Sequence, residues 1–406
     1  MLWAVLLALN ILLIGLFAFC RLHLQVASNC RALVRTWRRR RTGRRGHAKR
    51  GKKPGGHGGG RLSPEYDFVV EVWARCHPLG WSRGEYTRTV TDVLHGRAVN
   101  ILYVVHRRYC LLCRREAEPQ IHGVMPGFRF GNNLIRYAVN LRVKEKLTYE
   151  SISSIIEDTY GVEVTAQTIH DWCLKAAELS KPIYLDLDRL ADQGEVLHVD
   201  ETGMPVDGRN EWLWVKVTRD ATVYRVYGNR DSQALRDLLR GWRGRVAVSD
   251  FYPALNAIQE LGVMEQKCRA HLFRLVGKAL EESRSPKAEG FIHQLRELFS
   301  LKSTREAETG LDRLLDKYGE ALRADKALRR LGKLLKRHRN QLFTYMDQGH
   351  VPRTNNLAER EIRPFIVLRK RIQCFRSRAS AEAHARLLTV WRTRLRQGQP
   401  WLTGIL

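Results

Sequence analysis

Alternating apolar and polar residues predict a series of strands in the middle of the chain. An apolar run over 195–199 ends at Asp200, and another ends at Asp250. Between them, residues 212–217 and 223–227 are rich in the β-branched and aromatic side chains that favour strands. The pattern therefore predicts an α/β fold for this part of the chain.

The order of these elements, together with their acids, indicates one kind of core. A helix is expected over 232–242, between the third and fourth strands. Three strands, a helix and a further strand, with acids after the first and fourth strands, is the layout of a ribonuclease H-like core. Such a core takes its third acid from a later helix. Glu359 lies in a helix predicted over 358–363, and residues 354–356 before it are suited to capping.

Two neighbouring acids compete for these positions. Glu201 follows Asp200, and Glu361 lies two residues after Glu359. On a helix, two residues correspond to a rotation of about 200°, so only one of Glu359 and Glu361 can line a given site. A single acid taken alone is more often a solvated surface charge.

A helix-turn-helix pattern precedes the predicted strands. Apolar residues recur at helical spacing over 149–160, Gly161 interrupts them, and Thr165 is suited to cap a second helix. Gln167 and His170 on that second helix are the candidate DNA-reading residues. The alternative is a plain helical hairpin that packs on the catalytic core.

The 108 residues between Asp250 and Glu359 exceed what a bare core of this kind needs. Apolar residues recur at helical spacing over 291–343, so we expect helices there. Basic residues would form the outer face of this segment: Arg329, Arg330, Lys333, Lys336, Arg337 and Arg339.

Composition favours a nucleic-acid partner. The chain has 406 residues, 44% of them hydrophobic, and a formal net charge of +28. Such a length allows two or three domains, and such an excess of positive charge favours salt-dependent binding to phosphates. Residues 31–61 contain a dense basic run without an acid and then become glycine-rich, so we expect a disordered basic arm.

A second basic series follows Glu359 and is a candidate for contacts with DNA phosphates. A solvated surface is the alternative. The series comprises Arg360, Arg363, Arg369, Lys370, Arg371, Arg376 and Arg378.

Three motifs in this order resemble those of DDE transposases of the insertion-sequence sixty-six family. They are HVDETG, RVAVSDFYPAL and NNLAEREIRPFIVLRKRIQCFRS, and the resemblance extends from about Gly51 to the end of the chain. It implies a nuclease and strand transferase in which Asp200, Asp250 and Glu359 hold two divalent ions, with Asp200 as the bridging ligand. It also implies that the helices before Glu359 form an insertion domain.

The chemistry of strand cleavage requires such a set of acids. In-line attack on a phosphodiester develops charge on the entering and leaving oxygens, which two metal ions can stabilise. Mg²⁺ or Mn²⁺ suits the oxygen ligands. The expected partners are the DNA of the element ends and of the target, together with further copies of the chain, in the cytoplasm at the nucleoid. The alternative is a catalytically inactive, transposon-derived DNA-binding protein.

Two pairs of residues could bind metal elsewhere. Cys110 and Cys113 resemble half of a structural zinc site in this family, for which Cys76 and His77, or His106, are the remaining candidate ligands. Two buried thiols are the alternative.

Cys268 and His271 have a spacing found in several DDE families. On a helix start their side chains lie one turn apart. We expect them to support the active site rather than to bind the catalytic ions.

The first residues do not fit the rest of the pattern. Residues 1–19 are almost wholly apolar and just long enough to span the core of a bilayer. The basic residues that follow would keep the remainder in the cytoplasm. A start site read too far upstream is the alternative to this membrane contact.

The predicted organisation follows from these segments. We expect an apolar segment (1–30), a basic glycine-rich linker (31–63), a zinc-knuckle region (64–130), a helix-turn-helix region (131–185), the first part of the catalytic core (186–272), a helical insertion (273–350) and the end of the core (351–406).

Overall fold

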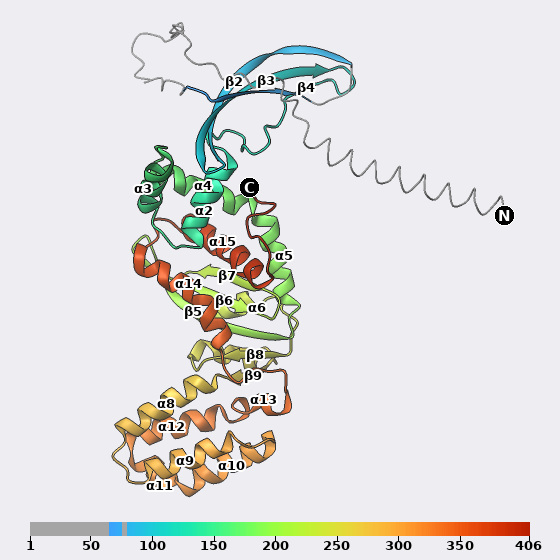
Figure 1. Ribbon diagram of the computed structural model, residues 1–406. Helices are drawn as coiled ribbons and strands as arrows, with labels where there is room; N and C mark the ends of the chain where they lie inside the picture. The colour runs from blue at the N-terminus through green and yellow to red at the C-terminus, as the bar shows by residue number, and fades with distance from the viewer. Residues whose placement is uncertain (1–64, 75–78) are drawn as a thin grey trace, which may run out of the picture. The chain divides into compact units, whose positions relative to one another are not determined.

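The computed structural model describes residues 65–74 and 79–406, which divide into two compact units (Figure 1). The first unit includes residues up to 135 together with 159–162, and the second comprises 136–158 and 163–406. The predicted apolar segment, the basic linker, Cys76 and His77 lie outside the described residues. Within the described ranges, no helix is long and apolar enough to cross a membrane.

The first unit contains a sheet that the sequence pattern did not predict. Strand β3 (Arg97–Cys110) pairs in parallel with β1 (Phe68–Trp73) and antiparallel with β2 (Gly80–Leu94) and β4 (Arg115–Ala117). His95 and Gly96 connect β2 to β3 with φ of 49° and 75°. Left-handed backbone at both positions is what a two-residue hairpin turn requires.

The second unit is built on a five-stranded sheet. Its strands are β5 (Val196–Val206), β6 (Arg209–Val217), β7 (Thr222–Tyr227), β8 (Val246–Ser249) and β9 (Met264–Lys267). Their order is β7-β6-β5-β8-β9; β5, β6 and β7 are antiparallel neighbours, whereas β8 is parallel to β5 and β9 to β8. The sequence pattern predicted β5 to β8, and the chain is thus of the mixed α/β class.

Helices cover both faces of this sheet. Helices α14 (Asn356–Ile372) and α15 (Arg378–Arg396) lie on one face, whereas α6 (Ser232–Leu239), η1 (Pro253–Asn256) and α7 (Ala257–Glu260) lie on the other. The N–H groups of Thr222 and Tyr224 on edge strand β7 donate to Thr393 Oγ1 and Thr389 Oγ1 of α15, both at 3.0 Å. Helix α15 therefore covers the edge of the sheet, which leaves fewer backbone groups open to a further strand.

Two helices form where the pattern predicted them, α3 (Tyr149–Tyr160) and α4 (Ala166–Leu179). They are flanked by α2 (Asn132–Val143) and α5 (Lys181–Asp192). Thr165 caps α4, because its hydroxyl accepts a hydrogen bond from Thr168 N at 3.2 Å. Helix α4 packs on α15, and α5 packs against β7.

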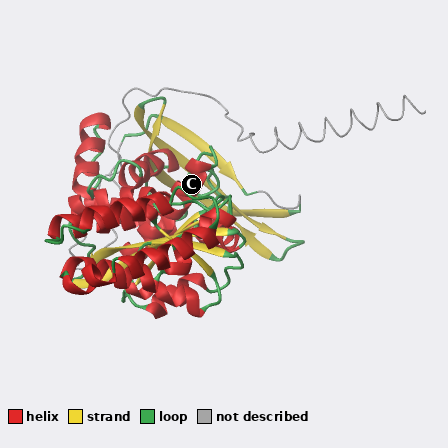
Figure 2. Cartoon of the chain, turned by 90° about the horizontal axis from the view of Figure 1, so that it is seen from below, coloured by secondary structure: helices red, strands yellow, loops and turns green. Residues whose placement is uncertain are grey.

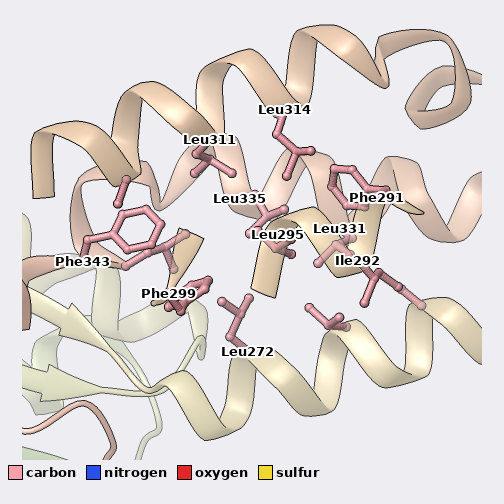
Figure 3. Close-up of a cluster of buried hydrophobic side chains, with 14 of the residues drawn as sticks. Leu272, Phe291, Ile292, Leu295, Phe299, Leu311, Leu314, Leu331, Leu335 and Phe343 are labelled. Atoms are coloured by element: carbon pink, nitrogen blue, oxygen red, sulfur yellow. The ribbon is translucent and has the colours of Figure 1, made fainter. Parts of the chain in front are cut away.

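The segment between β9 and α14 is helical, as its apolar spacing predicted. It contains α8 (Arg269–Glu282), α9 (Ala288–Leu298), α10 (Thr304–Lys317), α11 (Gly319–Ala324), α12 (Lys326–Arg337), η2 (Arg339–Gln341) and α13 (Thr344–Asp347). Figure 3 shows Leu272, Phe291 and Leu335 from different helices pointing into one apolar interior. These helices share one apolar core with Val246 and Val248 of β8, and Figure 2 shows how helix-rich the chain is.

The buried imidazole of His384 generates a prediction about stability and pH. His384 lies on α15 near the rings of Phe365 and Phe375, and burial, assisted by the charge of Arg142, lowers its pKa to about 3. The unfolded chain binds a proton at this ring below its ordinary pKa near 6.5. Stability should therefore fall as the pH decreases from about 6.5 towards 3.

The variant His384→Leu should flatten this decline in thermal unfolding curves measured between about pH 7 and pH 4. The same change at His293, whose side chain is 77% exposed, is the control and should leave the slope as it is. An unaltered slope in His384→Leu would show that this ring does not contribute.

Candidate active site

Asp200 and Asp250 are brought together by the register of two parallel strands. His198 of β5 pairs with Val248 of β8, so two further residues along each strand lead to Asp200 and Asp250. The expectation that Asp200 ends its strand is wrong, because β5 continues to Val206 alongside β6. The neighbouring strand β8 ends at Ser249, beside Asp200. Because β8 ends there, the Asp200 carboxylate can reach the cavity.

Glu359 reaches the same place from the first turn of α14, whose start is fixed by a buried asparagine. Asn355 is 1% exposed, and its Nδ2 donates to Val199 O at 2.8 Å. Its Oδ1 lies 3.1 Å from His198 Nδ1, and its backbone N–H donates to Cys268 Sγ at 3.1 Å. One residue thereby ties α14 to β5 and to the residue that precedes α8.

Asp200 and Glu359 open into one cavity of about 670 Å³. Asp200 and Glu359 line it together with His271, and several arginines lie around them. The complete set of lining residues is Asp200, His271, Arg274, Asn356, Glu359, Arg360, Ile362, Arg363 and Ile366. The cavity therefore combines carboxylates with guanidinium groups, a combination suited to a metal-bound phosphate.

The electrostatics at Asp200 favour a cation. Burial and the charges of Glu201, Asp250 and Glu359 together raise its pKa to about 7, against a lowering hydrogen bond from the Glu201 backbone. Glu359 Oε1 is buried and has no hydrogen-bond partner among the described residues. A hard divalent ion, which prefers oxygen ligands, would relieve the repulsion between these carboxylates.

The two competing acids are engaged by arginines. Glu361 is 1% exposed, and Arg392 donates to its two carboxylate oxygens, each at 2.8 Å. Glu201 accepts hydrogen bonds from Arg230 Nε at 2.8 Å and from its Nη2. Both acids are therefore held in ion pairs, whereas Glu359 faces the cavity, as the 200° rotation between Glu359 and Glu361 predicted.

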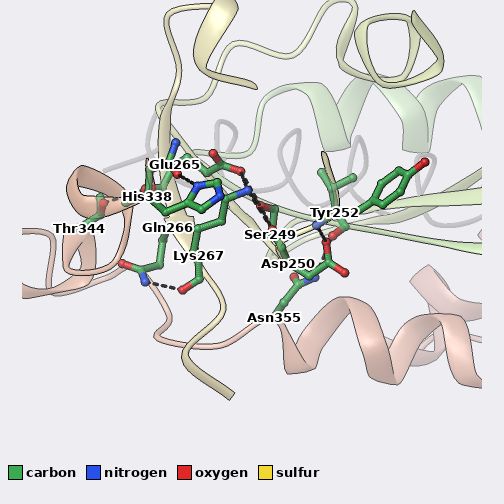
Figure 4. A network of polar contacts seen from close by, with 11 residues as sticks. Ser249, Asp250, Tyr252, Glu265, Gln266, Lys267, His338, Thr344 and Asn355 are labelled. Carbon is green, nitrogen blue, oxygen red and sulfur yellow. Dashed lines mark hydrogen bonds and ion pairs between the residues drawn. The ribbon is translucent and has the colours of Figure 1, made fainter. Parts of the chain in front are cut away.

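A buried lysine supports the end of β8 beneath Asp250 (Figure 4). Lys267 Nζ donates to Asp250 O at 2.9 Å, to Ser249 Oγ at 3.0 Å and to Glu265 Oε1 at 2.7 Å. Asp250 Oδ1 also accepts a hydrogen bond from Tyr252 N at 2.8 Å. Sequence reasoning missed Lys267, although a lysine and a glutamate two residues apart in a short buried strand were a detectable signal.

Cys268 and His271 adjoin this site, as their spacing suggested. His271 Nδ1 lies 3.4 Å from Glu359 Oε1, and Arg274 Nη2 lies 3.7 Å from Glu359 Oε2. The Cys268 thiol beside the ring raises the pKa of His271, although burial opposes this. The pair is thus in contact with a candidate catalytic acid.

Comparison with known proteins identifies the family. The family model described as "Transposase IS66 family" matches residues 127–383, which include all three candidate acids. The chain belongs to the IS66 transposase family. The search of curated proteins found no match. Family membership indicates a transposase function, and transposases act on DNA.

The basic residues after Glu359 have different surroundings in this IS66-family chain. Arg360 and Arg363 are exposed and line the cavity. Arg369 is instead held by β5, because its Nη1 donates to Thr202 Oγ1 at 3.0 Å and to Gly203 O. Lys370 and Arg371 are exposed farther along α14, and Arg371 Nη1 donates to Glu145 O at 3.2 Å.

The candidate DNA-reading residues of α4 have different surroundings. His170 Nε2 lies 2.6 Å from Ser380 Oγ on α15. Gln167 is exposed and donates to Asp171 Oδ1 at 2.8 Å. Acids predominate on the exposed surface of α3, α4 and the turn between them: Glu150, Glu157, Asp158, Glu163, Asp171 and Glu178. Such a surface does not attract phosphates, so the electrostatics favour a packing role for this hairpin.

The candidate zinc pair lies in the first unit. Cys110 ends β3, and Cys113 N donates to Cys110 Sγ at 3.5 Å. His106 stacks on Trp73 with ring centroids 3.7 Å apart, and its Nδ1 lies 3.1 Å from Glu85. These contacts engage the ring face and Nδ1 of His106, whereas its Nε2 has no hydrogen-bond partner among the described residues. The other candidate ligands, Cys76 and His77, lie outside the described residues.

The surroundings of the two glutamates on α14 predict opposite effects on stability. Glu361→Gln leaves the buried Arg392 without a charged partner, which should cost about 3–5 kcal/mol of unfolding free energy. Glu359→Gln removes a carboxylate from a repulsive cluster and should leave stability unchanged or raise it. Chemical denaturation of both variants measures the difference, and an equal loss in the two would contradict these assignments.

Proposed function

We propose that this chain is a DDE transposase with a ribonuclease H-like core, which cleaves DNA at the ends of an insertion sequence and joins those ends to target DNA. The proposal is supported by three antiparallel strands followed by two parallel ones, in the order β7-β6-β5-β8-β9. The observation that carries it is the single cavity lined by Asp200 and Glu359, with Asp250 on the adjacent strand.

Asp200, Asp250 and Glu359 would hold divalent ions, Mg²⁺ or Mn²⁺. When bound, such ions stabilise the charge that develops on the attacking and leaving oxygens of a phosphodiester. Burial and the mutual repulsion of the carboxylates raise the pKa of Asp200, and both dispose the set towards cations. The Lys267 network and the Asn355 hydrogen bonds hold the backbone that carries these acids.

The reaction would proceed in two balanced steps. Water attacks the phosphodiester at the element end, and the bond to the 3′ oxygen breaks to leave a 3′ hydroxyl and a 5′ phosphate. That hydroxyl then attacks a phosphodiester of the target, forming one new 3′–5′ bond and releasing one target 3′ hydroxyl. The second step conserves the number of phosphodiester bonds, so it needs no external energy source.

Arginines at the cavity would position the DNA backbone. Arg274, Arg360 and Arg363 line the same cavity as the acids. Guanidinium groups bind phosphates with two parallel hydrogen bonds, which fixes orientation as well as position. A catalytically inactive DNA-binding protein would keep these arginines without needing the acids, so cleavage distinguishes it from the enzyme.

The first functional prediction concerns the three acids. Asp200→Asn, Asp250→Asn and Glu359→Gln should each reduce metal-dependent strand cleavage roughly 10²-fold or more, because each removes charge needed mainly in the transition state. Binding to end DNA should be retained. Cleavage of labelled end duplexes and gel-shift binding measure the two effects.

The control for these variants is Asp186→Asn, which neutralises an acid that is 71% exposed on α5. It should cleave like the unaltered chain. Full cleavage by Glu359→Gln would remove this residue from the catalytic set, and no cleavage by the unaltered chain with either ion would support the inactive alternative.

A second functional prediction concerns the arginines at the cavity. The double variant Arg360→Ala/Arg363→Ala should reduce the slope of log affinity against log salt by about 2, since each phosphate contact contributes about 0.9. The double variant Arg189→Ala/Arg240→Ala is the matched control, because both side chains are exposed and pair locally with Asp186 and Asp237. Equal salt-dependence slopes in the two double variants would show that the DNA backbone does not contact Arg360 and Arg363.

A further inference from the structure

A second set of metal donors meets the active site at Glu359. Ligand atoms of Cys268, His271 and Glu359 all lie within 4.8 Å of one another. Within the part of the chain that the structure describes, no other group of three or more histidine, cysteine, aspartate or glutamate residues is this close. The three residues come from the start of α8 and the first turn of α14.

The backbone holds these donors in place. Cys268 precedes α8 and His271 lies three residues later, so their side chains project from one helical turn. The hydrogen bond from Asn355 N–H to Cys268 Sγ connects this turn to α14. Cys268 is buried, and its position at a helix start favours a thiolate.

Two of the donor atoms lack hydrogen bonds. His271 Nδ1 and Glu359 Oε1 are buried, have no hydrogen-bond partner among the described residues, and lie 3.4 Å apart. Buried polar atoms ordinarily make hydrogen bonds, so two such atoms in a contact as long as this remain available to a further ligand. A metal ion between the histidine nitrogen, the carboxylate oxygen and the sulfur would satisfy all three donors.

The chemistry of the donors selects the ion. A thiolate, an imidazole and a carboxylate are ligands for Zn²⁺, whereas Mg²⁺ prefers oxygen alone. Thiolate and carboxylate together carry two negative charges, which balance a divalent ion. Because His271 and Glu359 also line the cavity, a fourth coordination position would be open to it.

We propose that Cys268, His271 and Glu359 form a zinc site that shares Glu359 with the catalytic set, so that zinc withdraws this carboxylate and stops strand cleavage. The inhibitory part rests on the proposed transposase function, whereas zinc binding itself does not. Binding deprotonates Cys268 and releases one proton.

Binding is tested with Co²⁺, which replaces Zn²⁺ in such sites and gives an absorption band when a thiolate coordinates it. The full chain should show such a band, and Zn²⁺ should abolish it. Cys268→Ser should lose the part of the band that the Cys268 thiolate contributes, whereas Cys374→Ser should keep the whole band. The double variant Cys110→Ser/Cys113→Ser removes any part of the band that comes from the other candidate cysteine pair.

His271→Ala and Glu359→Gln test the rest of the donor set, and serve if Cys268→Ser does not fold. Each should lower Co²⁺ affinity at least tenfold while leaving the circular dichroism spectrum unchanged. A band that persists at full strength and affinity in Cys268→Ser and His271→Ala would overturn the site.

Inhibition is tested by adding Zn²⁺ to Mg²⁺-supported cleavage of end DNA. Expressed relative to the Mg²⁺ activity of each variant, Cys268→Ser should need at least tenfold more zinc for half inhibition than Cys374→Ser. Equal zinc sensitivity would overturn the shared-ligand proposal. A chain that shows the Cys268-dependent band but never cleaves DNA would instead refute the proposed function and leave the zinc site standing.

Discussion

The buried amide of Asn355 is the contact on which the arrangement of the acids depends. Glu359 is separated from Asp200 by more than 150 residues, and the helical insertion lies between them along the chain. Asn355 nevertheless fixes the position of Glu359 relative to Asp200. Its side chain bonds the backbone at Val199 and the ring of His198, one and two residues before Asp200. A fully buried amide loses roughly 1–3 kcal/mol for each group left unpaired. The start of α14 is therefore determined by the same strand that carries the first aspartate.

Charge pairing then separates structural acids from candidate catalytic ones. Glu201 and Glu361 each meet an arginine that donates two hydrogen bonds, and Glu265 meets the buried Lys267. Asp200 has no such partner and has a raised pKa, while Glu359 keeps one oxygen without a hydrogen bond. Sites that perturb carboxylates without neutralising them are where function is to be expected. The folded chain thus pairs Glu201, Glu265 and Glu361 with basic side chains and leaves the repulsion between carboxylates uncompensated at Asp200.

The sequence allowed much of this second unit to be predicted, because its strands and helices follow simple periods. The alternation over 195–250 and the capping of α4 by Thr165 are local signals. The bonds from Asn355 to β5 are not, since they join segments whose proximity no pattern reveals. The β2–β3 hairpin differs from these bonds, because its alternating Thr and Val residues and the His95-Gly96 turn are local signals from which it can be predicted.

Net charge was the least precise of the sequence signals. A charge of +28 indicates a phosphate partner but does not locate it. On the folded chain, the hairpin of α3 and α4 exposes mainly acids, while Arg360 and Arg363 stand beside the carboxylates of the cavity. In the proposed complex, arginines placed there would offset part of the repulsion between DNA phosphates and the acids. The proximity of opposite charges at α14, rather than the total charge, therefore locates the expected path of the DNA backbone.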